Sequence, residues 1–270
     1  DLGPLRLTGA TVGVTTVRPG ATLDLALGWQ AVGPSRPDAR AVHTIVAADG
    51  RSVDLSSARP GGDSYPPDRW VPGEVMLDRR QVILPPDLIA GVATLRVRVE
   101  PAGSPAGPPQ QADIGSVEIV SRPAVLTPPS RIGQPTDFVF GRFARLVGYT
   151  LSPTHPRPGD ELRLTLYWQA EAPSDREYVV FTHVLDAQSK VIAGHDKPPL
   201  DGANPTTGWQ RGEYITDDYV LRLPTSTQPG EYDLEIGLYE PTTGARAPAE
   251  DAGGHPAGDR IVVARIRIAR

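Results

Sequence analysis

The sequence contains no cysteine, and its 270 residues include only one methionine, Met76, and one asparagine, Asn204. The absence of cysteine excludes disulfides, thiolate metal sites and a cysteine nucleophile. Lysine occurs only at Lys190 and Lys197, against 25 arginines. Scarcity of asparagine and methionine is typical of a thermophile, although GC-rich codon usage produces the same bias.

Long apolar runs are also missing. No run approaches the roughly 18 residues that a membrane span needs, and the chain does not begin with a signal peptide. It begins with Asp1 rather than methionine, which predicts a processed protein or a part of a longer one. We therefore expect no membrane span in this chain, while the full-length protein can carry one elsewhere.

The charge pattern and the missing motifs narrow the function further. The formal net charge is -5 and the basic residues form no stripe, which makes nucleic acid an unfavourable partner. No GxSxG, GxxxxGK or HExxH motif is present, nor a GxGxxG that opens a helix. The only asparagine lies in Asn204-Pro205-Thr206, where proline blocks glycosylation. The sequence thus predicts neither an enzyme nor a cofactor.

The residues that are abundant indicate an all-β protein. There are 28 glycines and 30 prolines, which favour turns over helices. Apolar residues alternate in segments such as Leu162, Leu164, Leu166 and Trp168, the pattern of a strand with one buried face.

The sequence also repeats itself. RPGATLDLALGWQA at 18–31 returns as RPGDELRLTLYWQA at 157–170, and the same offset of 139 positions aligns identities along most of each half. We predict two tandem immunoglobulin-like or fibronectin-like β-sandwich domains that arose by internal duplication, with a jelly roll as the alternative packing. The predicted boundaries are a divergent first copy at 1–121, a stiff proline-rich linker at 122–138 and a second copy at 139–270.

The first copy departs from the second at several positions. In the alignment of the sequences His43 falls opposite Phe181, and Ile45 falls opposite His183. A ligand of the second copy is therefore not expected to bind the first.

The second copy resembles a known module over nearly all of 139–270. The segments that carry the resemblance are RLVGYTL, RPGDELRLTLYWQA, YVVFTHVLD, HDKPPLDGANPTTGW, RGEYITDDYVLRLP and PGEYDLEIGLYEPTTG. They are similar to a β-sandwich module at the extracytoplasmic C-terminal ends of membrane proteins in filamentous green non-sulfur bacteria. Many of those proteins look like family 39 (dolichyl-phosphate-mannose type) glycosyltransferases. The resemblance implies an extracytoplasmic, cell-surface or membrane-anchored location, and it leaves open a membrane glycosyltransferase as the parent protein.

The tryptophans divide into two pairs. Trp29 and Trp168 lie in phase with leucines and are expected in the core. Trp70 and Trp209 lie in loops, where an exposed indole could stack on a sugar, but recurrence in both copies favours a loop anchor. If a ligand binds, the candidate contacts in the second copy are Trp209, Asp196, Asp201, Asn204 and Tyr214.

Two kinds of chemistry are weak alternatives. Glu213 with Asp217 or Asp218 would supply the two carboxylates of a glycoside hydrolase, but a sandwich of this size seldom encloses a suitable cleft. Asp196, Asp201 and Asn204 offer oxygen ligands for calcium within one loop, yet the same residues are ordinary turn formers. The histidines at 183, 195 and 255 lack the short spacing of a zinc site.

The favoured interpretation is a non-catalytic extracytoplasmic module that binds or positions something at the cell surface, either a glycan or a protein partner. A purely structural spacer is the alternative, and a glycoside hydrolase is the least favoured.

Overall fold

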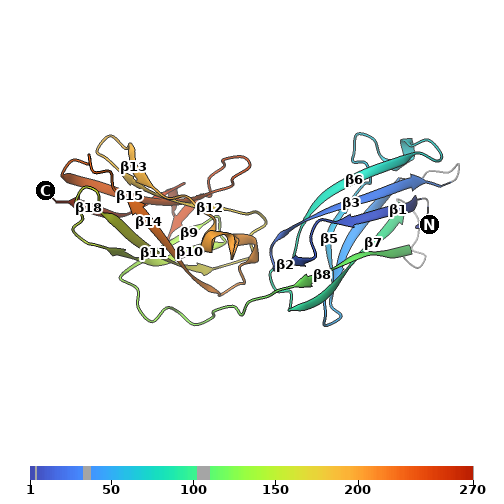
Figure 1. The fold of residues 1–270 in the computed structure, drawn as a ribbon, viewed down its shortest axis with the longest axis horizontal. Coiled ribbons are helices and arrows are strands. Elements are labelled where there is room, and N and C mark those ends of the chain that lie inside the picture. Colours follow the sequence, from blue (N-terminus) through green and yellow to red (C-terminus); the bar gives the residue numbers. More distant parts are fainter. Residues whose placement is uncertain (4, 33–37, 102–109, 270) are drawn as a thin grey trace. The chain divides into compact units, whose positions relative to one another are not determined.

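The computed structural model describes residues 1–3, 5–32, 38–101 and 110–269. The chain forms two compact units, Asp1–Arg122 (unit 1) and Pro123–Arg270 (unit 2). Both are built from β-strands, and the described residues add three short 3-10 turns but no α-helix (Figure 1). The prediction of an all-β protein is therefore confirmed. Within the described part of the chain no helix is long and apolar enough to cross a membrane.

Unit 1 consists of two sheets that share one apolar core, as in a β-sandwich. One sheet has the strand order β1-β3-β6 and the other β2-β8-β7-β4-β5. Within the second sheet β2 runs parallel to β8, with Thr16 beside Glu118 and Val17 beside Ile119. The elements are β1 (Leu5–Val12), β2 (Thr16–Val17), β3 (Thr22–Ala31), β4 (Ala39–Val46), β5 (Ser52–Ala58), η1 (Pro67–Arg69), β6 (Val75–Ile83), β7 (Gly91–Pro101) and β8 (Gln110–Ile119).

Unit 2 has the same kind of construction with more strands. Its sheets have the orders β14-β11-β10-β9-β16-β17 and β13-β12-β15-β18, again around one core. The elements are β9 (Gln134–Phe140), β10 (Ala144–Ser152), β11 (Glu161–Ala170), β12 (Val179–Leu185), β13 (Val191–Gly194), η2 (Pro199–Gly202), η3 (Thr206–Gly208), β14 (Tyr214–Arg222), β15 (Gly230–Tyr239), β16 (Ala249–Asp251), β17 (Pro256–Gly258) and β18 (Ile261–Ile268).

The alternation seen in the sequence is the alternation of buried and outward side chains. In β3 and β11 every second residue is buried, and Trp29 and Trp168 are both 0% exposed. Both tryptophans are thus core residues, as predicted from their phase with the leucines. Part of the predicted linker, by contrast, is strand: β9 begins at Gln134 and pairs with β10.

Three strand pairings correspond at the same offset of 139 positions: β1–β3 with β10–β11, β3–β6 with β11–β14, and β4–β7 with β12–β15. Both β1–β3 and β10–β11 contain a register shift, and it falls after the residue that faces the core tryptophan, Leu7 or Leu146. The corresponding pairs of Cα partners are Leu7–Trp29 with Leu146–Trp168, Leu23–Val82 with Leu162–Leu221, and His43–Val97 with Thr182–Ile236.

These registers correct one detail of the sequence alignment. His43 occupies the position of Thr182, and Ile45 that of Val184, because their partners Val97 and Leu95 correspond to Ile236 and Leu234. The alignment of His43 with Phe181 and of Ile45 with His183 was wrong by one residue. A slip of one residue exchanges the two faces of a strand, so the earlier alignment compared side chains that lie on opposite faces.

Candidate functional site

Trp209 is part of the core of unit 2. Its side chain is 0% exposed, its ring centroid lies 6.2 Å from that of Trp168, and its indole N–H donates to the main-chain oxygen of Asn204 at 3.1 Å. An indole in this position has no free face for a sugar. The prediction of an exposed aromatic platform at Trp209 is therefore wrong. Inside the unit the large apolar ring is withdrawn from water and its N–H still has a hydrogen-bond acceptor.

Trp70 in unit 1 is held in the same way. It is 0% exposed and its indole N–H donates to the main-chain oxygen of Tyr65 at 2.9 Å. Each tryptophan follows a short 3-10 turn, η1 or η3, whose first residue accepts a hydrogen bond from the tryptophan main-chain N–H at 3.3 Å. Both loop tryptophans thus serve as anchors that fix the loop before β6 or β14.

A buried polar cluster of unit 2 lies where the segment after β13 meets β14. Asp217 on β14 is 0% exposed, and its Oδ1 lies 3.0 Å from Nζ of Lys197, whose side chain is 8% exposed. The main-chain N–H of Leu200 donates to the same oxygen at 3.1 Å. Lys197 itself pairs with Val180 on β12 through two main-chain hydrogen bonds. The cluster therefore connects the two sheets of the unit.

Tyr219 completes this cluster. Its hydroxyl donates to Oδ2 of Asp217 at 2.5 Å, and Nζ of Lys197 lies 4.8 Å from the centre of its ring. Burial raises the pKa of Tyr219 above its ordinary range, and the charge of Asp217 and their hydrogen bond raise it further. The hydroxyl is therefore a permanent proton donor to the carboxylate.

The three calcium candidates have separate surroundings. Oδ1 of Asp196 lies 3.0 Å from Nε2 of His183, and Oδ1 of Asp201 lies 3.3 Å from Nζ of Lys197. Asn204 is buried, and its Nδ2 has no hydrogen-bond partner among the described residues. Two of the oxygens thus face side-chain nitrogens. Within the described ranges no group of three or more acidic or histidine side chains is arranged to hold a metal ion.

His183 belongs to a second polar cluster of unit 2. Its ring lies between two carboxylates, with Nε2 3.0 Å from Asp196 and Nδ1 3.2 Å from Oε1 of Glu235. Arg260 approaches the other oxygen of Glu235 at 3.2 Å. Carboxylates thus contact both ring nitrogens, which makes this histidine part of a network of polar contacts.

The carboxylates proposed for a hydrolase each contact a neighbouring group. Glu213 is 1% exposed and accepts the main-chain N–H of Gln210 at 3.0 Å, a contact within its own turn. Asp217 is engaged by Lys197, while Asp218 accepts the hydroxyl of Thr165 at 2.6 Å. Tyr214, the remaining ligand candidate, is partly exposed at the start of β14, and its main-chain N–H donates to Val125 at 2.7 Å.

Unit 1 has a buried carboxylate at the position of Asp217, but with a different cation. Asp78 on β6 corresponds to Asp217 by register, and its Oδ2 lies 2.8 Å from Nε of Arg80. Burial raises the pKa of Asp78 by more than its contacts with Arg80 lower it.

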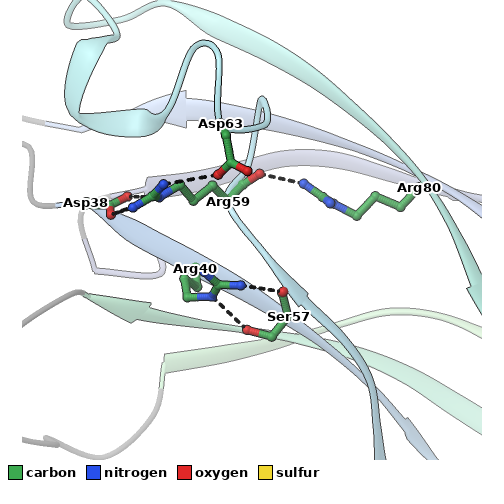
Figure 2. A network of polar contacts seen from close by, with 6 residues as sticks. All are labelled: Asp38, Arg40, Ser57, Arg59, Asp63 and Arg80. Carbon is green, nitrogen blue, oxygen red and sulfur yellow. Dashed lines mark hydrogen bonds and ion pairs between the residues drawn. The ribbon is translucent and has the colours of Figure 1, made fainter.

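Arg80 in turn connects this ion pair to a surface network. Its guanidinium donates to the main-chain oxygen of Arg59 at 2.6 Å, and the side chain of Arg59 binds Asp38 and Asp63 (Figure 2). Arg40 lies nearby in the same view and holds Ser57 on the neighbouring strand through two hydrogen bonds. The two units thus place a carboxylate at one position and neutralise it with different residues, arginine in unit 1 and lysine in unit 2.

Sequence reasoning did not single out Lys197 or Tyr219. Two signals were available: Lys197 is one of only two lysines, and Tyr219 alternates with Asp217 and Leu221 on the inward face of β14. The alternation predicts that these side chains point inward, but it does not say which distant residue meets them.

The fold and the cluster define an all-β protein of two sandwich-like units, one of which contains a buried lysine–aspartate pair. No protein-family model matches the chain, and no curated protein matches it. Among solved structures, red sea bream transglutaminase aligns with 98% of this chain at 7% identity and a TM-score of 0.28. The chain spans 32% of the length of that protein, and a likeness at this level carries no argument about fold type or function.

Proposed function

We propose that the chain is a non-catalytic, structural pair of domains that positions other parts of a larger extracytoplasmic surface protein. The observation that carries this proposal is the complete burial of Trp209, the residue best suited among the candidates to stack on a sugar. Of the other candidates, Asp196 and Asp201 contact neighbouring side chains and Asn204 is buried. A spacer requires stable, self-contained units. Polar side chains that contact one another within a unit, and not a ligand, fit this requirement.

We further propose that the two units arose by tandem duplication of an immunoglobulin-like sandwich. The common offset of the strand registers supports this origin, as do the matching tryptophan anchors. Glu74 and Glu213 add a third parallel, since each accepts the main-chain N–H of the residue three positions earlier, at 2.8 and 3.0 Å. Conformations of this kind are fixed by local sequence, so their recurrence at one offset favours common descent of the two halves.

A glycan or a protein partner at the cell surface remains the second candidate. It is favoured by the resemblance of the second copy to extracytoplasmic modules and by Tyr214, which is partly exposed. The structural role is preferred because the other residues that would form the binding site are buried or lie in contact with neighbouring side chains.

Titration calorimetry of the intact chain against cell-wall glycans separates the two. If the chain is purely structural, we expect no saturable heat of binding for any of these glycans. Saturable binding that disappears in Tyr214→Ala but persists in Val220→Ala, an exposed residue on the same strand, would favour the glycan alternative. Turnover of a glycoside that is lost in Glu213→Gln would instead favour a hydrolase.

A second experiment tests the independence of the units. Asp1–Arg122 and Pro123–Arg270, produced separately, are each expected to unfold in one cooperative thermal transition. Failure of either unit to fold alone would contradict a modular spacer.

A further inference from the structure

Lys197 is an exceptional residue in this chain. The sequence uses arginine 25 times and lysine twice, and the other lysine, Lys190, lies exposed in the turn after β12. Arginine is the usual cation for a buried ion pair because its guanidinium is weakly hydrated and binds carboxylates through two donors. A chain that prefers arginine so strongly nevertheless places lysine here. The property that lysine has and arginine lacks is a primary amine that becomes a nucleophile once it loses a proton.

The surroundings bring this amine against a single carboxyl group. Nζ of Lys197 lies 3.0 Å from Oδ1 of Asp217, and both side chains are withdrawn from water, at 8% and 0% exposure. Close, fixed contact between two reacting groups corresponds to effective concentrations of roughly 10⁵–10⁸ M in favourable cases. Exclusion of water also opposes the reverse reaction, hydrolysis.

The backbone at Leu200 and Asp201 is strained, and the same two residues contact the lysine–aspartate pair. Leu200 and Asp201 have φ values of 52° and 54°, a left-handed conformation that non-glycine residues seldom adopt. It accompanies the approach of the Leu200 N–H to Oδ1 of Asp217 at 3.1 Å and of the Asp201 carboxylate to Nζ of Lys197 at 3.3 Å. Strain of this kind persists where the surrounding structure holds it in place, often at functional sites.

We propose that Lys197 and Asp217 condense to form an intramolecular amide bond between Nζ and Cγ. The reaction requires no cofactor and no external reagent. It joins the segment after β13, which pairs with β12, to β14 on the other sheet. The product is a covalent link between the two sheets of unit 2.

The balance of the reaction is one ammonium and one carboxylate giving one amide and one water. Nζ passes one proton to Oδ1, which lies 3.0 Å away and is held by the N–H of Leu200, so that a neutral amine faces a neutral carboxylic acid. The lone pair of the amine then attacks Cγ, Nζ gives its second proton to the same oxygen, and the Cγ–Oδ1 bond breaks. Oδ1 departs as water and Oδ2 becomes the amide oxygen, so the two protons that leave Nζ equal the two that Oδ1 gains.

Two groups are placed to assist this step. Asp201, whose Oδ1 lies 3.3 Å from Nζ, holds the amine beside the carboxyl group of Asp217. Tyr219, whose hydroxyl lies 2.5 Å from Oδ2, donates a hydrogen bond to the oxygen on which negative charge collects as Nζ attacks. Tyr219 is thus a catalytic residue of this step, since it touches a reacting atom.

Unit 1 supplies a natural comparison. At the matching position Asp78 contacts Arg80, and a guanidinium does not form an amide with a carboxylate under these conditions. The reaction is therefore confined to unit 2.

Intact-mass spectrometry of the purified, denatured chain tests the proposal directly. The expected mass is lower than the sequence mass by one water molecule. Trypsin cuts after Lys190, Arg211 and Arg222 but not between Lys197 and Pro198, so the peptides 191–211 and 212–222 should remain joined. A chain of full sequence mass, with these two peptides separate, overturns the proposal.

Two lysine variants provide a matched pair. Lys197→Arg preserves the charge and is expected to restore the full sequence mass, whereas Lys190→Arg, the same change at the exposed lysine, should retain the loss of water. Asp217→Asn is expected to lose ammonia instead of water if the amine attacks this side chain. Persistence of the water loss in Lys197→Arg would assign it to another site. The mass of the wild-type chain alone tests the amide bond, so the test still stands if a variant fails to fold.

Discussion

The indole N–H of Trp209 donates to the main-chain oxygen of Asn204, five positions earlier in the chain, at 3.1 Å. This bond joins the loop that contains the ligand candidates to the core of unit 2. A candidate ligand-binding residue thus contributes to the stability of the fold. Its removal is expected to lower the free energy of unfolding and not a ligand affinity.

Trp209→Ala is expected to lower the free energy of unfolding of unit 2 by about 3–5 kcal/mol, since it removes a fully buried indole and leaves a cavity. Urea denaturation followed by circular dichroism measures the loss. Trp70→Ala should cost unit 1 a similar amount, because its indole makes the same contact with Tyr65. Val191→Ala, at a side chain 45% exposed, should change stability by no more than about 0.5 kcal/mol.

His43 should make the stability of unit 1 depend on pH. Burial lowers its pKa from 6.5 to about 4, and the nearby charge of Arg80 adds to the shift. Between these values the unfolded chain binds a proton that the folded unit excludes, so stability rises with pH from about 4 to 6.5 and is lost as pH falls. The full effect is roughly 3 kcal/mol.

The matched variant for this prediction is His43→Thr, which introduces the residue found at the corresponding register of unit 2. Urea denaturation at several pH values between 4 and 7 should give a smaller slope of stability against pH for the variant. Equal slopes for both proteins would show that His43 titrates normally.

Glu240 should titrate well below an ordinary glutamate. The hydroxyl of Thr243 donates to its carboxylate, as do the main-chain N–H groups of Thr242 and Thr243 at 2.8 and 3.0 Å, and together they lower its pKa from 4.5 to about 2. The stabilisation is present above pH 4.5 and is lost as pH falls toward 2.

An NMR titration of the Glu240 carboxyl carbon measures this pKa directly. In Thr243→Val one donor is removed, and the midpoint should move up toward 4.5. Thr225→Val, a threonine outside this turn, is the control and should leave the midpoint unchanged. A midpoint near 4.5 in the wild type would contradict the hydrogen-bonded turn.

Gly237 should be intolerant of any side chain. It faces Phe181 across the β12–β15 pair, and a Cβ at this position would lie 2.3 Å from Cζ of that buried ring. Gly237→Ala is therefore expected to destabilise unit 2 by about 1–3 kcal/mol through overpacking. Gly9→Ala, where a Cβ meets nothing within 4 Å, should have little effect on thermal stability. Equal midpoints for the two variants would contradict the close packing of Phe181.

The strand content and the core tryptophans were predictable because they depend on alternation, which is a local property. The two faces of β11 follow from Leu162, Leu164 and Leu166, whose spacing leaves Trp168 on the same buried side. The surroundings of Trp209 and Lys197 were not predictable in this way. Both lie in loops, and their contacts depend on which distant strand closes over them.

The charged residues illustrate the same limit. Asp196, Asp201 and Asn204 are close in sequence, and this proximity suggested one calcium site. In the structure Asp196 faces His183 on β12, whereas Asp201 faces Lys197. Neighbours in a loop diverge when the backbone turns between them, as it does at Leu200 and Asp201.

The parallel pairing of β2 with β8 has a mechanical consequence. β2 lies near the beginning of unit 1 and β8 at its end, and the two strands run in the same direction side by side. Tension that reaches β2 from its N-terminal side and β8 from its C-terminal side pulls them past each other along their length. The hydrogen bonds from Glu118 to Thr15 and from Val120 to Val17, at 2.8 and 2.9 Å, then bear the load together in shear instead of opening one after another. Unfolding under tension is governed by the rate of unfolding, so this short pair of strands contributes to the time that unit 1 withstands a steady pull.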